Sequence, residues 1–459
     1  MAAKNAAKKR QAAGRLTKAS AVLARHFGRI PLATIMSSSR EYPTPARVDL
    51  DRALNELLPQ YRNARHLSLH VEHLWEALTL SHMLGNRNAE VYIGPLQSEQ
   101  VDLGEDEPVN CTKRALWVAQ HGRLPFAVIA GQAKHHGRES GLLIEVAVPP
   151  GEAGAELARR LLLQLDERVR RAPAYRGRVI KLEQTDRYDG SACAIRVHKL
   201  RRVEQNHVIL PQRTLALLDR NVIGFVAQRE KLRALGLPAR KGLLFYGPPG
   251  TGKTHTLHYL ASRLEGHTTL LITSEQVGLL DQYFQLARFL QPAILVIEDA
   301  DLIARSRESM GSACEEVLLN KLLNEMDGLR EDAEILFVLT TNRPEHLEAA
   351  LASRPGRIDQ AIEFPLPDDE GRRRLARLYS ADVAIDPNLL DFIVRRTQGA
   401  SGAFLKELMR RAAQFLLEIG DTALHTMHLE SALGEMLFDG GSLNRKLLGG
   451  DGIAAGQGA

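Results

Sequence analysis

Gly242 to Leu264 reads GLLFYGPPGTGKTHTLHYLASRL, and this stretch decides the fold of the second half of the chain. Its centre matches the phosphate-binding pattern GxxxxGK[ST]. An apolar run (LLFY) precedes the pattern and a run with helical periodicity follows it, which predicts a strand, a glycine-rich loop and a helix in that order. The predicted anion-binding loop consists of Gly247, Pro248, Pro249, Gly250, Thr251, Gly252, Lys253 and Thr254.

The residue types in this loop suit a phosphate chain. Glycines let consecutive backbone N–H groups turn inward around an anion without a Cβ clash. A helix that starts near Lys253 adds the positive end of its dipole. We expect Lys253 to reach the β- and γ-phosphates of a nucleoside triphosphate, and the Thr254 hydroxyl to ligate magnesium.

A second motif, QPAILVIEDAD, covers Gln291 to Asp301. Its continuous apolar run predicts a central parallel strand that helices cover on both faces. Acids at the carboxyl end of such a strand lie where ligands bind in open α/β sheets. We expect Glu298 to hold magnesium, usually through water, and Asp299 to orient an attacking water. A strand that ends in a solvated acidic turn is the alternative.

A third apolar run, Ile335 to Thr340, is followed by Asn342, whose side-chain amide could hold the attacking water or the γ-phosphate. The segment ASRPGRID comes ten residues later and contains Arg354 and Arg357. Arginine spreads positive charge effectively onto a transferring phosphoryl group. These three residues are therefore catalytic candidates, although in isolation the two arginines would be surface residues of a turn.

The positive charge of the chain is concentrated at its N-terminus. Residues 1–40 contain nine Lys and Arg and no acid, whereas the net charge of all 459 residues is only +5, so the remainder is net acidic. We expect a solvated, disordered arm over residues 1–44. Binding of nucleic acid or another anionic surface through this arm and a mitochondrial transit peptide are the alternatives.

The length suits two or three domains. Helical spacing over residues 47–85 and strand-like runs over 111–203 predict a separate α+β domain that would recognise a substrate or adaptor. Alternating strand and helix patterns follow, then helical patterns alone, then a glycine-rich end. The predicted parts are an arm at 1–44, an α+β domain at 45–205, an α/β domain at 206–365, a helical lid at 366–438 and a disordered tail at 439–459.

Several classes of protein and site are disfavoured. No apolar run approaches the ~18 residues of a membrane helix, so we expect no membrane span. Cys111, Cys193 and Cys314 lack CxxC-like spacing, which argues against a disulfide framework or a zinc finger and favours a reducing, cytoplasmic setting.

Three histidines are weighed as a metal site. His66, His70 and His73 would share one face if their segment were helical, and imidazoles are common metal ligands. One helix rarely supplies three ligands in tetrahedral geometry, so a polar helix face is the favoured interpretation.

Together the motifs of the second half resemble those of the AAA family of ATPases over about residues 206–438, and the similarity does not extend to residues 1–205. GPPGTGKT is similar to the family's Walker A motif, AILVIED to Walker B, TTN to sensor 1, and ASRPGRID to the second region of homology with its two arginine fingers. The resemblance implies an α/β P-loop NTPase core with a parallel sheet and an all-helical lid.

The resemblance also implies function. ATP and Mg²⁺ would be the cofactors, and the chain would form a ring of identical subunits, often a hexamer. Arg354 and Arg357 would then complete the site of the neighbouring subunit. Relatives use the ATP cycle to pull, unfold or dismantle proteins, so an unidentified protein client is expected.

Three departures from the family pattern concern the site. The acids stand in the order Glu298-Asp299, which resembles the subgroup of the mitochondrial Rieske-protein translocase and is the reverse of the usual order. Ala403 stands where some relatives carry a sensor 2 arginine. The segment ITSEQVGLLDQYFQLAR is too short for the usual aromatic pore loop, which puts threading in doubt.

The expected function is therefore an ATP-hydrolysing ring that remodels or disassembles a protein client. Two alternatives stay open at this point. One is a nucleotide-gated assembly scaffold with little hydrolysis. The swapped acids change the reach of each carboxylate by about one methylene, and a shift near 1 Å can lower the rate ~100-fold. The other is an ATPase that contacts nucleic acid through the basic arm, although Phe27 is the only Phe, Tyr or Trp among residues 1–40.

Overall fold

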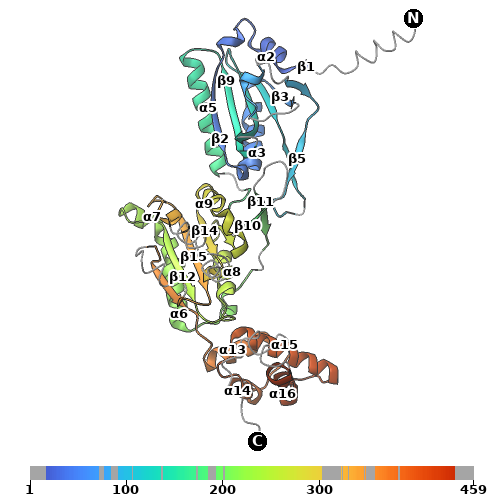
Figure 1. Cartoon of the computed structure of the whole chain (residues 1–459), viewed down its shortest axis with the longest axis vertical. Coiled ribbons are helices and arrows are strands. Elements are labelled where there is room, and N and C mark those ends of the chain that lie inside the picture. The colour runs from blue at the N-terminus through green and yellow to red at the C-terminus, as the bar shows by residue number, and fades with distance from the viewer. Residues whose placement is uncertain are drawn as a thin grey trace, which may run out of the picture. The chain divides into compact units, whose positions relative to one another are not determined.

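Two seven-stranded β-sheets organise the computed structural model, and the chain divides into two compact units, Met1–His198 and Lys199–Ala459 (Figure 1). The structure describes all residues except 1–16, 72–76, 84–90, 106, 136–137, 172–173, 185–192, 200–201, 302–321, 323, 329, 346, 348–356, 381–382 and 440–459.

The first sheet is antiparallel, with the strand order β1-β4-β3-β7-β8-β9-β2. Its interior strands carry long buried runs, and the first five residues of β7 are all buried. The strands are β1 (Thr17–Lys18), β2 (Met36–Tyr42), β3 (Arg62–Val71), β4 (Val91–Gly94), β7 (Ala115–His121), β8 (Leu124–His135) and β9 (Arg138–Val148).

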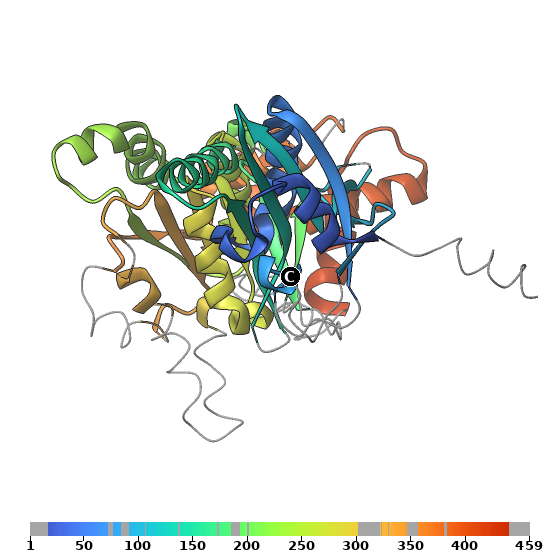
Figure 2. The same ribbon diagram turned by 90° about the horizontal axis from the view of Figure 1, so that it is seen from above.

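Helices and two hairpins complete the first unit. The long helix α5 runs beside β2 and β9 and is seen end-on from above (Figures 1 and 2). The helices are α2 (Ala19–Phe27), α3 (Arg47–Leu57), α4 (Leu80–Met83), α5 (Glu152–Arg171), η1 (Leu32–Thr34), η2 (Thr44–Ala46) and η3 (Leu58–Gln60). The hairpins pair β5 (Ser98–Val101) with β6 (Val109–Thr112), and β10 (Val179–Gln184) with β11 (Cys193–His198).

The disordered arm predicted for residues 1–44 is wrong for residues 17–44. Ala19, Leu23 and Phe27 lie four residues apart, on one face of α2, and are buried in the core of the first unit. Strand β2 adds to the sheet through seven residue pairs with β9. Burial of these apolar side chains and pairing with β9 order a segment whose basic charge suggested a solvated arm. Residues 1–16 lie outside the described part of the chain.

The predicted histidine face is also wrong, because His66 and His70 lie in strand β3 rather than in a helix. Four residues of strand separate them by about 13 Å, too far to share a metal ion. His66 stacks on Trp117 with ring centroids 4.2 Å apart, and the His70 ring Nε2 lies 2.7 Å from the Pro95 carbonyl. His73 falls outside the described residues.

The second unit contains the predicted parallel sheet, with neighbouring strands in the order β13-β14-β15-β12-β16. Strands β14 and β15 are buried at every position, as expected of central strands covered on both faces. The elements are α6 (Gln212–Leu218), α7 (Phe225–Ala234), β12 (Lys241–Tyr246), α8 (Lys253–Arg263), β13 (Thr268–Ile272), α9 (Leu280–Phe289), β14 (Ala293–Ile297), β15 (Ile335–Thr341) and β16 (Gln360–Glu363), with η4 (Gln205–His207), η5 (Asp219–Gly224) and η6 (Ser274–Leu279) between them.

The short connection from β13 to α9 is a 3-10 turn closed by Gln276. The Gln276 side-chain oxygen accepts hydrogen bonds from the Thr273 N–H (3.3 Å) and the Tyr283 hydroxyl (3.1 Å). Gln276 itself is buried. The expectation that this segment leaves little room for a pore loop stays a prediction.

The last described elements form the predicted helical lid, made of α13 (Asp369–Tyr379), α14 (Pro387–Arg396), α15 (Gly402–Ile419), α16 (Thr426–Gly434) and η8 (Glu435–Asp439). Side chains cap three of these helices: Asp368 accepts from Gly371 N–H, Asp386 from Leu389 N–H and Ser401 from Phe404 N–H. Phe404, Leu405 and Leu408 anchor the lid core. No helix among the described residues is long and apolar enough to cross a membrane.

Candidate active site

The glycine-rich loop joins β12 to α8 at the carboxyl end of the sheet, as the sequence predicts. Gly247, Gly250 and Gly252 have φ values of 146°, 76° and 95°, which L side chains rarely adopt. A Cβ at Gly247 would lie 2.2 Å from the Phe364 carbonyl oxygen. Backbone conformation therefore favours glycine at all three positions, and close packing does so at Gly247 as well. Helix α8 begins at Lys253, directly after the turn.

Lys253 is buried, and carbonyl groups of the glycine-rich loop bind its ammonium group. The Nζ atom donates hydrogen bonds to the carbonyls of Gly247 (2.8 Å) and Pro248 (2.9 Å). Burial lowers the pKa of Lys253 to about 8, while the carboxylates of Asp299 and Asp301 act in the opposite direction. The side chain is thus a cation near neutral pH, positioned inside an anion-binding loop.

This pKa makes nucleotide binding pH-dependent. Above pH 8 the free protein loses the Lys253 proton, and binding a polyphosphate must restore it. We expect the Kd for ATP to rise above pH 8 by up to about tenfold per pH unit, and to be nearly constant between pH 7 and 7.5. Titrating ATP between pH 7 and 10 measures this. Lys253→Arg, which stays charged throughout, should give a flat profile; a flat wild-type profile would contradict the assignment.

The two acids of the second motif have different partners, which separates their roles. The Thr254 hydroxyl donates to Glu298 Oε1 at 2.9 Å. Asn342 Nδ2 donates to Asp299 Oδ1 at 3.0 Å. The structure thus pairs Glu298 with the predicted magnesium ligand and Asp299 with the predicted water-holding amide, as the order along the sequence suggested.

Asp299 is held in a strained conformation, with a φ of 49° that is uncommon for a residue other than glycine. Its N–H donates to the Thr340 hydroxyl at 3.1 Å. Nearby, Asp301 is buried and accepts hydrogen bonds from the Thr341 hydroxyl (2.8 Å) and the Asn342 N–H (3.3 Å). Asp301 therefore fixes the turn that carries Asn342, a positioning role that the sequence pattern did not assign.

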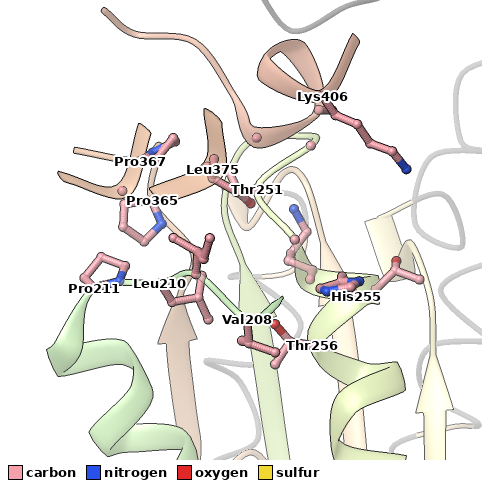
Figure 3. Close-up of a pocket in the computed structure, with 18 of the residues that line it drawn as sticks. Val208, Leu210, Pro211, Thr251, His255, Thr256, Pro365, Pro367, Leu375 and Lys406 are labelled. Atoms are coloured by element: carbon pink, nitrogen blue, oxygen red, sulfur yellow. The ribbon is translucent and has the colours of Figure 1, made fainter. Parts of the chain in front are cut away.

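One pocket of about 600 Å³ is lined by Lys253, Thr254, Asp299, Thr340 and Asn342 (Figure 3). One wall is the segment from His207 to Gln212, and Figure 3 places Val208, Leu210 and Pro211 on this side. The lid contributes Arg374, Leu375, Tyr379 and Lys406 from α13 and α15. Sequence motifs did not point to these lid residues, because they reach the pocket only through tertiary packing.

The phosphate-binding loop and the lid touch directly at Gly250. The Ala403 N–H at the start of α15 donates to the Gly250 carbonyl at 3.1 Å. A Cβ at Gly250 would meet Ala403 Cβ at 2.8 Å and Ser401 Oγ at 2.9 Å. Ala403, the residue at the sensor 2 position, therefore contacts the loop through its backbone.

Gly250→Ala is expected to weaken ATP binding by at least about tenfold, because the added methyl pushes the first turn of α15 away from the loop and strains a left-handed residue. Equilibrium binding of a fluorescent ATP analogue measures the effect. Gly266→Ala is the matched control, since Gly266 has a similar φ of 81° but open space around it. Equal affinities for the two variants would contradict the proposed loop–lid contact.

Arg357 lies at the opposite edge of the sheet from the phosphate-binding loop. Its carbonyl lies against Gly242, near the start of β12, and the loop begins after the end of that strand, roughly 16 Å farther along. Its guanidinium forms an ion pair with Asp327. Arg357 is thus not brought to the pocket of its own chain, and Arg354 lies outside the described residues.

The metal candidates form a pair rather than a closed cluster. Among the described residues, no group of three or more His, Cys, Asp or Glu side chains is arranged to hold a metal ion. Thr254 and Glu298 alone would leave most positions of an octahedral magnesium ion to water and phosphate oxygens, which is the usual arrangement for this ion.

Comparison with known proteins agrees with this geometry. Residues 243–366 match the family model described as "ATPase family associated with various cellular activities (AAA)". The chain carries an AAA ATPase domain. The match begins in β12 and ends just after β16, so it covers the loop, both acids, Asn342 and both arginines.

Three curated relatives match between 41% and 47% of this chain. A proteasome-activating nucleotidase from Methanothermobacter thermautotrophicus is 36% identical over 200 residues, which are 41% of this chain and 48% of the relative. The 26S proteasome regulatory subunit 6A of Schizosaccharomyces pombe is 33% identical over 222 residues, 46% of this chain and 50% of the relative. An ATP-dependent zinc metalloprotease FtsH of Ureaplasma parvum is 31% identical over 227 residues, 47% of this chain and 31% of the relative.

The chain spans about half the length, or less, of these relatives. The predicted fold class, an α/β P-loop AAA core with a parallel sheet and an all-helical lid, preceded by a separate α+β domain, is confirmed.

Proposed function

We propose that the AAA domain binds ATP with Mg²⁺ and hydrolyses it to ADP and phosphate, and that the chain does so as a ring of identical subunits that remodels a protein client. The proposal of ATP hydrolysis is supported by one observation: Lys253, Thr254, Asp299 and Asn342 line the same pocket. The Thr254 hydroxyl also hydrogen-bonds Glu298. The hexamer and the client rest on the family resemblance and on relatives named as proteasome subunits and an ATP-dependent protease.

The donor set fits a magnesium triphosphate. The loop offers a left-handed glycine turn, a buried ammonium and the start of an 11-residue helix, all of which favour an anion. Thr254 and Glu298 supply hydroxyl and carboxylate oxygens, the ligands that Mg²⁺ prefers. Bound magnesium would neutralise charge on the phosphate oxygens.

The remaining polar residues suit the transfer of the γ-phosphoryl group to water. Asp299 can accept a proton from water and orient it, and Asn342 holds the Asp299 carboxylate in place through its amide. Asp301 in turn fixes the backbone of Asn342. On the other side of the pocket, Lys253 donates to the transferring phosphate and keeps its positive charge near neutral pH.

A neighbouring subunit is proposed to complete the site. Arg357 lies at the far edge of its own sheet and pairs with Asp327, which does not line the pocket. A head-to-tail contact would carry the arginines of one subunit to the phosphates of the next, as the family resemblance implies for Arg354 and Arg357. The cytoplasmic location and the role of the first unit as a client-binding domain are likewise proposals.

Phosphate release from the full chain tests the enzymatic part. Wild-type protein and the control Lys181→Ala, in β10 of the first unit, should release phosphate from ATP at similar rates. Lys253→Ala should be slower by about 10²- to 10³-fold, since it removes a donor aimed at the phosphates. Tight ATP binding by the wild type without phosphate release would overturn hydrolysis and support the nucleotide-gated scaffold instead.

A further inference from the structure

Three segments of the first unit contain no acidic residue, although each of them contains Lys or Arg. They are residues 17–40, 57–71 and 108–138, and they include helix α2 and strands β3, β7 and β8. These elements are neighbours in the fold, because β3 pairs with β7, β7 pairs with β8, and α2 packs on β8. One continuous part of the first unit is therefore built from elements that carry basic residues only.

Exposed arginines gather at one end of this part of the sheet. Arg62 and Arg65, at the start of β3, pair with the last part of β7, just before the turn that carries Arg123. The end of α2 lies beside them, because the His26 ring Nε2 is 3.0 Å from the Phe126 carbonyl in β8. Burial lowers the pKa of His26, and the nearby positive charge of Arg65 adds to this effect. The group, called the end patch, consists of Arg25, Arg29, Arg62, Arg65 and Arg123, all exposed.

The arginines of the end patch have no acidic partner among the residues that the structure describes. Other exposed arginines of the first unit do: Arg159 pairs with Glu156, and Arg171 pairs with Glu167. An arginine without a carboxylate partner keeps its fork of N–H donors available for a ligand. Like charges that lie close together also repel one another, and a bound anion would relieve this repulsion. The end patch is therefore suited to an anionic partner.

The side chains around the end patch favour a nucleic acid over a protein or a membrane. Protein interfaces have an apolar core, and helices that bind membrane surfaces insert apolar side chains. The large apolar side chains exposed on the described part of the first unit are Met36, Leu96 and Leu163, and none lies in α2, β3, β7 or β8. Interfaces with DNA are more polar and more positively charged, and arginine binds phosphate oxygens through two parallel hydrogen bonds.

We propose that the end patch binds the phosphodiester backbone of a nucleic acid without reading its base sequence. Contacts to phosphates carry no sequence information, and none of the described Phe, Tyr and Trp side chains of the first unit is exposed for stacking on bases. The contact lies on the folded unit rather than on residues 1–16. The inference goes beyond the proposed function and does not depend on it, because the patch contains no residue that lines the nucleotide pocket.

Salt-dependent binding of a labelled duplex tests the proposal. Fluorescence anisotropy measures the affinity of the full chain for a fluorescein-labelled duplex DNA of about 20 base pairs, between about 50 and 200 mM salt. Arg25→Gln/Arg29→Gln/Arg65→Gln should bind at least about tenfold more weakly than the wild type. Its plot of log affinity against log salt concentration should be less steep by about 2 to 3, because three phosphate contacts are lost.

The matched control removes the same charge elsewhere in the first unit. Arg159→Gln/Arg170→Gln/Arg171→Gln changes three exposed arginines of α5 and should bind the duplex like the wild type. Duplex RNA of the same length distinguishes the two sources of a phosphodiester backbone: the end-patch variant should lose affinity for both, and the tighter ligand identifies the source. Wild-type ATP binding and thermal unfolding in both triple variants would show that they are folded.

Several results would overturn the inference. Equal DNA and RNA affinities of the two triple variants, or no binding of either duplex by the wild type at about 50 mM salt, would remove the end patch as a nucleic-acid site. Binding that is lost on deletion of residues 1–16 but kept by the end-patch variant would assign it to that basic segment. Tighter binding of poly-glutamate, or of vesicles that contain phosphatidylserine, would identify an acidic protein or a membrane as the partner instead. None of these readouts depends on ATP hydrolysis, so the proposed function is tested separately.

Discussion

Asp299→Asn is expected to bind ATP as tightly as the wild type and to hydrolyse it about 10²- to 10⁴-fold more slowly. Asparagine keeps the size of the side chain and its place beside Asn342 but removes the carboxylate that can take a proton from water. Asparagine also tolerates the positive φ of this position, so the fold should be retained. Single-turnover phosphate release together with equilibrium binding measures both quantities.

The matched controls address the unusual order of the acids. Asp332→Asn changes an exposed aspartate that pairs with Arg330 and should leave hydrolysis unchanged. Glu298→Gln should instead weaken magnesium-dependent ATP binding, because Glu298 is the acid that contacts Thr254. If Glu298→Gln kept full affinity and lost hydrolysis while Asp299→Asn stayed active, the roles of the two acids would have to be exchanged.

Arg357→Ala is expected to lower the hydrolysis rate by about 10³-fold while leaving the affinity of the isolated chain for ATP unchanged. The reason is geometric: Arg357 lies at the edge of the sheet away from its own phosphate-binding loop and can act only on the site of another subunit. Steady-state phosphate release and binding measure the two effects. Arg330→Ala removes an exposed arginine that pairs with Asp332 and serves as the control.

Mixing makes this prediction decisive. Arg357→Ala subunits keep an intact pocket, and Lys253→Ala subunits keep an intact arginine, so an equimolar mixture should recover part of the activity that each lacks alone. Because Arg357 also pairs with Asp327, thermal unfolding of Arg357→Ala and of Arg357→Lys should accompany the assay. A folded Arg357→Ala variant that hydrolyses ATP normally would contradict action across the interface.

The phosphate site was predictable because its signals are local. Each residue from Gly247 to Thr254 is required by backbone geometry or phosphate chemistry within one loop, and the structure gives that loop the expected left-handed glycines. The acids and Asn342 follow buried parallel strands, whose carboxyl ends meet at one edge. The sequence therefore predicted which residues meet, although they lie up to about 90 positions apart.

Other features depended on packing that no short pattern encodes. Tyr379 and Lys406 reach the pocket only because the lid folds back over the loop. The ion pair of Arg357 with Asp327 joins residues 30 positions apart, and the whole of strand β15 lies between them in the sequence. In the first unit, the spacing of polar and apolar residues around His66 suits a helix. His66 nevertheless lies in a strand, because this segment pairs with β7 and the pairing outweighs the local spacing.

The hydrogen bond from Ala403 to Gly250 makes α15 a rigid arm pivoted at the phosphate-binding loop. The helix has 18 residues and is about 27 Å long, so a tilt of about ten degrees at the pivot would displace its far end by about 5 Å. A sub-ångström change around a bound phosphate can thereby become a movement several times larger at Leu417, far from the chemistry. Exchange of one nucleotide for another would then move the far end of α15.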